Sequence, residues 1–127
     1  MKVLCRKIFS PMGKDLGDSS PWLKVGNEYV VLAMEITEGS GILIYIQTEQ
    51  NNEPAFFDLS GFQIINQHMP SSWVTVINDI DAKKSMVMLP AIWNYAGFFE
   101  QILNEEAEAI DKFNEAAEEI HLEEQTV

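Results

Sequence analysis

The chain has 127 residues, 46% of them hydrophobic, and a formal net charge of −12 at pH 7. This length and composition predict one globular domain with a substantial core and exclude an intrinsically disordered chain. The acidic balance disfavours direct binding to nucleic acid or an anionic membrane, and no apolar run approaches the roughly 18 residues that a membrane helix needs.

The N-terminal segment MKVLCRKIFSPMG has basic residues on both sides of short apolar pieces. It lacks the continuous apolar region and the small-residue cleavage site of a secretory signal, so we expect a cytosolic protein. The single cysteine, Cys5, cannot form an internal disulfide or a multi-cysteine zinc site. We expect Cys5 to be a small buried hydrophobic residue of the first strand.

Residues 1–89 predict a series of short strands. Val3–Phe9 suits a strand, and the stretch over 10–21, rich in Gly, Pro, Ser and Asp, predicts a loop. Strands recur at spacings of about ten residues without βαβ alternation, which predicts an antiparallel meander or a small barrel. The remaining strands are expected at Tyr29–Ile36, Gly41–Thr48, Pro54–Leu59, Gly61–Ile65, Trp73–Asp79 and Ser85–Leu89, with turns at 38–41, 49–52, 68–72 and 79–84.

Residues 90–125 predict a helical part. Pro90 opens a short helical turn, and Gly97 separates this turn from a long helix over 98–125. We therefore expect an α+β fold in one domain over 1–127, with the β-rich part packed against a long C-terminal helix. The apolar stripe that makes this contact has spacings of mostly three, four and seven residues: Phe99, Ile102, Leu103, Ile110, Phe113, Ala117 and Ile120.

The predicted helix concentrates negative charge. Residues 97–127 carry ten acidic residues and one basic residue, which gives a net charge of −9. Acidic residues in the last turns of a helix oppose its dipole by a few tenths to about 1 kcal/mol each. Glu115 and Glu119 also form a like-charged pair one helical turn apart. A solubilising face explains such charge, and so does the docking of a basic partner.

Aromatic residues are numerous, and we expect the three tryptophans, Trp22, Trp73 and Trp93, to contribute to the core. Phe56 and Phe57 are adjacent in a predicted strand, so their rings point to opposite faces of the sheet. One ring must then lie beneath the C-terminal helix or mark an interface.

The sequence contains no phosphate-binding loop, dinucleotide-binding motif, nucleophile elbow or zinc-protease motif. His68 falls in a turn and His121 among acidic residues of the last helical turn, without the spacing of a selective metal site. Residues 78–81 begin like a calcium loop but lack the required glycine and bidentate glutamate. We expect no enzyme activity, no metal site and no cofactor.

Three segments share a pattern with a known family: VGNEYVVLAMEI (25–36), PAFFDLSGFQIINQHMPSSWV (54–74) and LPAIWNYAGFFEQILNEE (89–106). The pattern is a glycine-led strand, an F-D-x-x-x-F stretch, a turn that leads into a tryptophan, and an aromatic-rich approach to an acidic helix. It resembles small acidic bacterial immunity proteins that are encoded beside polymorphic toxins, including those of contact-dependent growth inhibition systems.

The resemblance implies that the partner is a toxin domain, with a nuclease as the expected activity, since many such toxins are nucleases and nucleases are basic. Two rival hypotheses remain open, an acidic mimic of nucleic acid and a structural or assembly module, whereas no polar cluster supports a small-molecule barrel. The expected contact residues are Glu105, Glu108, Asp111, Glu115 and Glu119, with Asp58, Asp79 and Asp81, in or beside loops, as second candidates.

Overall fold

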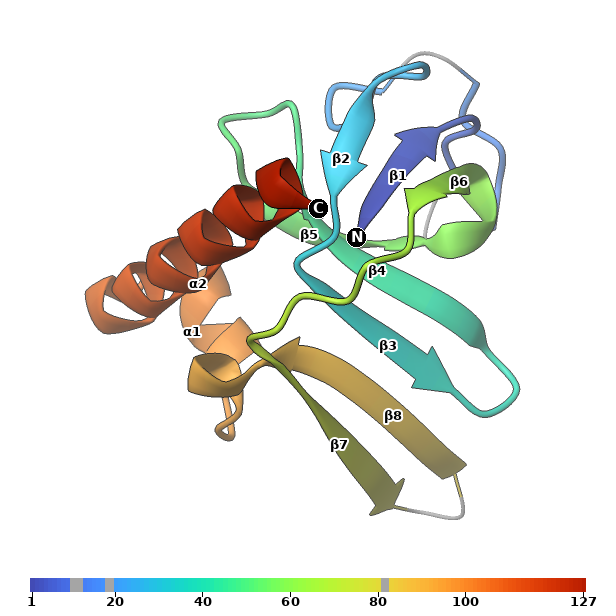
Figure 1. The fold of residues 1–127 in the computed structure, drawn as a ribbon. Helices are drawn as coiled ribbons and strands as arrows, with labels where there is room; N and C mark the ends of the chain where they lie inside the picture. The colour runs from blue at the N-terminus through green and yellow to red at the C-terminus, as the bar shows by residue number, and fades with distance from the viewer. Residues whose placement is uncertain (10–12, 18–19, 81–82) are drawn as a thin grey trace.

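The computed structural model describes residues 1–9, 13–17, 20–80 and 83–127 and has an α+β fold with two antiparallel sheets and a long C-terminal helix (Figure 1). The predicted fold class is confirmed. The strands are β1 (Lys2–Cys5), β2 (Glu28–Val30), β3 (Ala33–Thr37), β4 (Gly41–Gln47), β5 (Pro54–Asp58), β6 (Phe62–Asn66), β7 (Trp73–Ile80) and β8 (Lys83–Pro90). The helices are the 3-10 turns η1 (Leu59–Gly61) and η2 (Ala91–Trp93), and α1 (Phe98–Leu103) and α2 (Ala107–Thr126).

The five-stranded sheet, in the order β5-β4-β3-β8-β7, is the middle layer of the molecule. Neighbouring residues of β3 point to opposite sides of it: Ala33 belongs to the core shared with the helices, and Met34 to the core shared with β1. The three-stranded sheet, in the order β2-β1-β6, covers this second side. Cys5 is fully buried there, as predicted.

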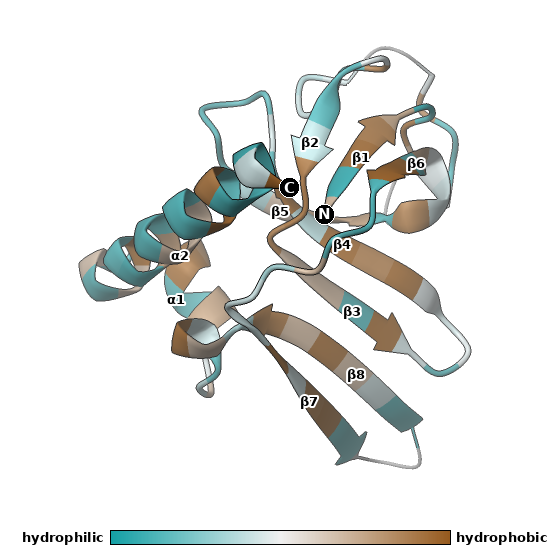
Figure 2. Cartoon of the chain, in the orientation of Figure 1, coloured by the Kyte–Doolittle hydropathy of each residue, from teal (hydrophilic) through white to brown (hydrophobic). Residues whose placement is uncertain are grey.

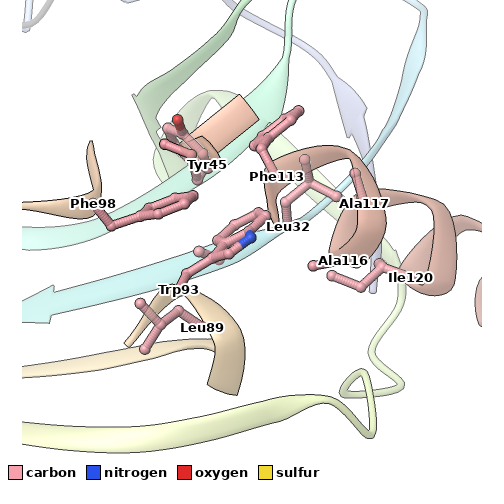
Figure 3. Close-up of a cluster of buried hydrophobic side chains, with 11 residues drawn as sticks. Leu32, Tyr45, Leu89, Trp93, Phe98, Phe113, Ala116, Ala117 and Ile120 are labelled. Atoms are coloured by element: carbon pink, nitrogen blue, oxygen red, sulfur yellow. The ribbon is translucent and has the colours of Figure 1, made fainter. Parts of the chain in front are cut away.

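The helical core is centred on Trp93, which is buried between the sheet and α2 (Figure 3). Its indole ring stacks with Phe98 at 5.1 Å and with Phe113 at 5.3 Å between ring centroids. The indole N–H donates a hydrogen bond to the Lys112 carbonyl of α2 at 2.9 Å. Phe56 of β5 lies 5.3 Å from Phe99 of α1, so one ring of the Phe56-Phe57 pair packs against the helical layer, as predicted.

The predicted strand over Tyr29–Ile36 is divided between the two sheets. Val31 donates its N–H to the Met1 carbonyl, next to β1, at 2.9 Å, and Leu32 donates to the Tyr45 carbonyl of β4 at 2.8 Å. The backbone therefore changes its pairing partner between these two buried residues, because β2 pairs with β1 and β3 pairs with β4. An alternating sequence pattern does not reveal such a change.

The predicted helix over 98–125 is also divided, because the chain turns at Asn104–Glu106. Glu105 has a left-handed φ of 54°. The Glu105 N–H bonds to the Ile102 carbonyl and the Glu106 N–H to the Gln101 carbonyl, each at 3.0 Å, which is a Schellman ending of α1. Leu103 is 80% exposed, so its place in the predicted apolar stripe is wrong. The predicted stripe treated 98–125 as one continuous helix, whereas the break at Asn104–Glu106 separates two helices with different axes.

Candidate partner-binding surface

Helix α2 has an apolar face toward the sheet and an acidic face toward solvent (Figure 2). The buried face comprises Ala109, Phe113, Ala116, Ala117 and Ile120, together with Glu124. On the opposite face, Glu108, Asp111, Glu115 and Glu119 follow one another at spacings of three and four residues, and all are exposed. The last turn carries no basic residue to offset the helix dipole.

Eight of the ten acidic residues of the C-terminal segment are exposed: Glu100, Glu105, Glu106, Glu108, Asp111, Glu115, Glu118 and Glu119. Among the residues that the structure describes, only Glu108 of these eight has an ion pair, with Lys112 at 3.9 Å. Lys112 also lies 4.6 Å above the Tyr95 ring, so it is held at the side of the helix. The acidic face of α2, defined here as Glu108, Asp111, Glu115 and Glu119, is thus left for solvent or a partner.

The other two acidic residues, Glu123 and Glu124, hold the fold together. Buried Glu124 accepts hydrogen bonds from the Met1 amino group at 2.9 Å and from the Asn66 side-chain amide at 2.7 Å. Glu123 accepts hydrogen bonds from the Ser71 hydroxyl and N–H, and lies 2.7 Å from His68. The sequence pattern did not distinguish these two glutamates from the solvent-facing ones.

The candidate residues do not form one continuous site. Glu105 lies in the turn before α2 rather than on the acidic face. Asp58 is partly buried and caps η1 by accepting a hydrogen bond from the Ser60 N–H at 2.9 Å. Asp79 belongs to the end of β7, which points away from α2 (Figure 1), and it pairs in register with Lys84. The predicted turn over 79–84 therefore starts later than expected, and Asp81 lies outside the described residues.

Neither histidine lies in a group of ligands. Within the part of the chain that the structure describes, no three His, Cys, Asp or Glu side chains come together as a metal site would require. Burial lowers the pKa of His121, as does the charge of Lys2, and its imidazole lies 3.3 Å from the Gln47 side-chain oxygen. Burial likewise raises the pKa of the Cys5 thiol, which disfavours the reactive thiolate.

A groove that the sequence did not predict runs along β5, with a volume of about 640 Å³. All five residues of β5 line it. The facing wall is apolar and includes Ile8, Phe9, Leu16 and Trp22. No local sequence pattern could have revealed this groove, because its lining joins the N-terminal segment to the β3–β4 turn and to β5, which are far apart in the sequence.

No family model, curated protein or solved structure matches this chain. Within the described ranges, no helix combines the length and the apolar character needed to cross a membrane.

Proposed function

We propose that this chain is an immunity protein that binds and neutralises a basic toxin domain, with a nuclease as the expected toxin. One observation carries the proposal: the acidic face of α2 is exposed and, apart from the Glu108–Lys112 pair, has no cation partner among the described residues. Glu123 and Glu124 make contacts within the fold, whereas Asp111, Glu115 and Glu119 form no ion pair within the described part of the chain. A cytosolic location is part of the proposal.

Electrostatic steering is the mechanism by which this face acts. An unpaired acidic face raises the rate at which a basic partner arrives in the right orientation, up to about 10⁸–10⁹ M⁻¹s⁻¹ at low salt. Rapid capture matters because a free toxin damages the cell until it is bound. Buried apolar or hydrogen-bonding contacts then provide specificity and slow dissociation.

The test compares two double variants that change the net charge equally. Asp111→Lys with Glu115→Lys reverses the middle of the acidic face, whereas Glu28→Lys with Glu38→Lys reverses one exposed acid of β2 and one of the β3–β4 turn. The probe is an inactivated toxin domain from the gene beside this one, and stopped-flow association rates are measured at several salt concentrations. We expect the α2 variant to associate about 10-fold more slowly and with a weaker salt dependence, and the control to change less than about two-fold.

Equal slowing by both variants would mean that total charge, and not the α2 face, attracts the partner. Unchanged rates in both would remove α2 from the interface. Binding of several unrelated basic proteins with similar affinity would favour the nucleic-acid mimic, and self-association alone would favour the assembly module.

A further inference from the structure

The exposed edge of β5 has the geometry of a site for strand addition. In the five-stranded sheet β5 is an outermost strand: it pairs with β4 on one side, and no strand among the described residues pairs with it on the other. The groove that runs along β5 is lined by all five residues of this strand, and its lining continues to Leu43 of β4 and to the β3–β4 turn. An edge strand that borders a groove offers unpaired backbone groups to an extended segment of another chain.

The hydrogen-bond pattern of the β4–β5 pair shows which backbone groups of β5 point toward β4 and which point toward the outer edge. The Thr48 N–H donates to the Glu53 carbonyl at 2.9 Å, where the β4–β5 hairpin begins. Bonded pairs recur every second residue in an antiparallel ladder, so the register assigns Ile46–Ala55 and Ile44–Phe57 as the next bonded pairs. Ala55 and Phe57 thus direct their backbone groups toward β4.

Phe56 has the opposite orientation. Its partner Tyr45 directs its carbonyl toward Leu32, on the β3 side of β4, so Tyr45 and Phe56 form a non-bonded pair. The N–H and carbonyl of Phe56 therefore point away from β4, toward the outer edge of the sheet. Pro54, two residues earlier, has the same orientation, and its missing N–H is tolerated because it faces away from the ladder.

The walls of the groove define the chemistry of the occupant. Ile8, Phe9, Leu16 and Trp22 form an apolar wall. Trp22 is 47% exposed there, so the prediction that it contributes to the core is wrong. Glu53 precedes β5 and Asp58 ends it, so a carboxylate stands near each end of the floor. Among the described residues that line the groove, none is Lys, Arg or His.

We propose that the β5 groove binds an extended segment of a partner protein, which adds a sixth strand beside β5. Alternate apolar side chains of the segment contact the apolar wall, and flanking Lys or Arg residues lie near Glu53 and Asp58. The segment exchanges two backbone hydrogen bonds with Phe56. The proposal concerns a surface other than the acidic face of α2, and it does not require that the partner be a toxin.

The first test is amide hydrogen exchange of the full chain, followed by NMR. In the free protein, the Ala55 and Phe57 amides should exchange slowly and the Phe56 amide at least about 10-fold faster, since only the first two bond within the sheet. Equal protection of all three amides would mean that the edge is already paired, and the proposal would fail.

The second test uses random 12-residue peptides displayed on phage and selected on the immobilised full chain. The best peptides are then synthesised, and binding is followed by tryptophan fluorescence and by exchange of the Phe56 amide. We expect apolar residues to alternate between Lys or Arg, the Phe56 amide to become protected at least about 10-fold, and N-methylation of the peptide backbone on one edge to abolish binding.

Substitutions in and outside the groove test whether the selected peptides bind there. Trp22→Ala should weaken peptide binding at least about five-fold, whereas Ile77→Ala, which truncates a 68% exposed side chain on β7 at the other edge of the sheet, should leave it unchanged. Glu53→Gln with Asp58→Asn should weaken Lys-bearing peptides, and asparagine retains the cap of η1. The proposal would be overturned if N-methylated peptides still bound, or if Trp22→Ala and Ile77→Ala weakened binding equally. Either result would mean that the groove does not bind a strand. An absence of any selected peptide would overturn the proposal as well.

Discussion

At the scale of single residues, Gly61 shows how closely η1 approaches the segment that follows β1. The Gly61 carbonyl accepts hydrogen bonds from the N–H groups of Arg6 at 2.9 Å and Lys7 at 3.0 Å. A Cβ atom at Gly61 would collide with the Lys7 carbonyl oxygen and would lie 3.2 Å from a ring carbon of Phe9. The position therefore requires glycine for space and not for a positive φ.

Gly61→Ala should lower the free energy of unfolding by about 2 kcal/mol, because backbone atoms cannot move aside as a flexible side chain does. Urea denaturation measures the change. The matched control is Ser60→Ala at the exposed neighbouring position, which should stay within about 0.5 kcal/mol of the wild type. Equal stability of Gly61→Ala and the wild type would show that η1 and the segment after β1 can move apart at little cost.

At the scale of elements, the break between α1 and α2 depends on a glutamate in a conformation that favours glycine. Glu105 has a φ of 54°, whereas the next residue, Glu106, has an ordinary φ of −69°. The left-handed conformation costs a residue with a Cβ roughly 1–2 kcal/mol. The hydrogen bonds of the Schellman ending offset this cost.

Glu105→Gly should raise the free energy of unfolding by about 1 kcal/mol, since glycine adopts this conformation without strain. Glu106→Gly removes the same charge at an ordinary φ and should lower stability by a few tenths to about 1 kcal/mol. Thermal and urea denaturation of both variants provide the comparison. A loss of stability in Glu105→Gly would mean that the Glu105 side chain itself supports the turn.

At the scale of the whole molecule, the end of α2 joins parts of the chain that are far apart in sequence. Glu124 contacts Met1 and Asn66, and Glu123 contacts His68 and Ser71, so the last helical turn closes the fold where both termini lie (Figure 1). Burial makes the Glu124 contacts important, because the loss of one partner leaves a charge without compensation.

The Glu123 contact makes stability depend on pH. Hydrogen bonds from the Ser71 hydroxyl and N–H, and then from His68, lower the pKa of Glu123 to about 2 from its ordinary value of 4.5. Because the folded pKa is lower than the unfolded one, the contact contributes fully above about pH 4.5 and is lost as the pH falls toward 2. Glu123→Gln should therefore be less stable than the wild type at pH 6.

The difference between Glu123→Gln and the wild type should shrink as the pH falls from 4.5 toward 2, in urea midpoints measured at each pH. Glu119→Gln, at an exposed position without a partner in the described chain, is the matched control and should follow the wild-type curve at a constant offset. If the stability difference between Glu123→Gln and the wild type were also constant across this pH range, the fold would not stabilise the Glu123 carboxylate.

The sequence by itself determined the features that depend on neighbouring residues. Alternation and turn residues located the β4–β5 hairpin, and helical periodicity placed Phe113 and Ile120 on the buried side of α2. The same periodicity placed Glu108, Asp111, Glu115 and Glu119 together on the exposed side, since one helical turn spans 3.6 residues. These patterns are local, so they can be read without knowing the fold.

Only the tertiary structure decided the features that depend on distant residues. Asn66 and Glu124 are 58 positions apart, and their contact separates a structural glutamate from its solvent-facing neighbours. The change of sheet at Val31–Leu32 and the groove along β5 likewise depend on which strands lie beside each other. Strand pairing sets the direction in which each backbone N–H and carbonyl points, and the sequence of one strand does not show which strand it pairs with.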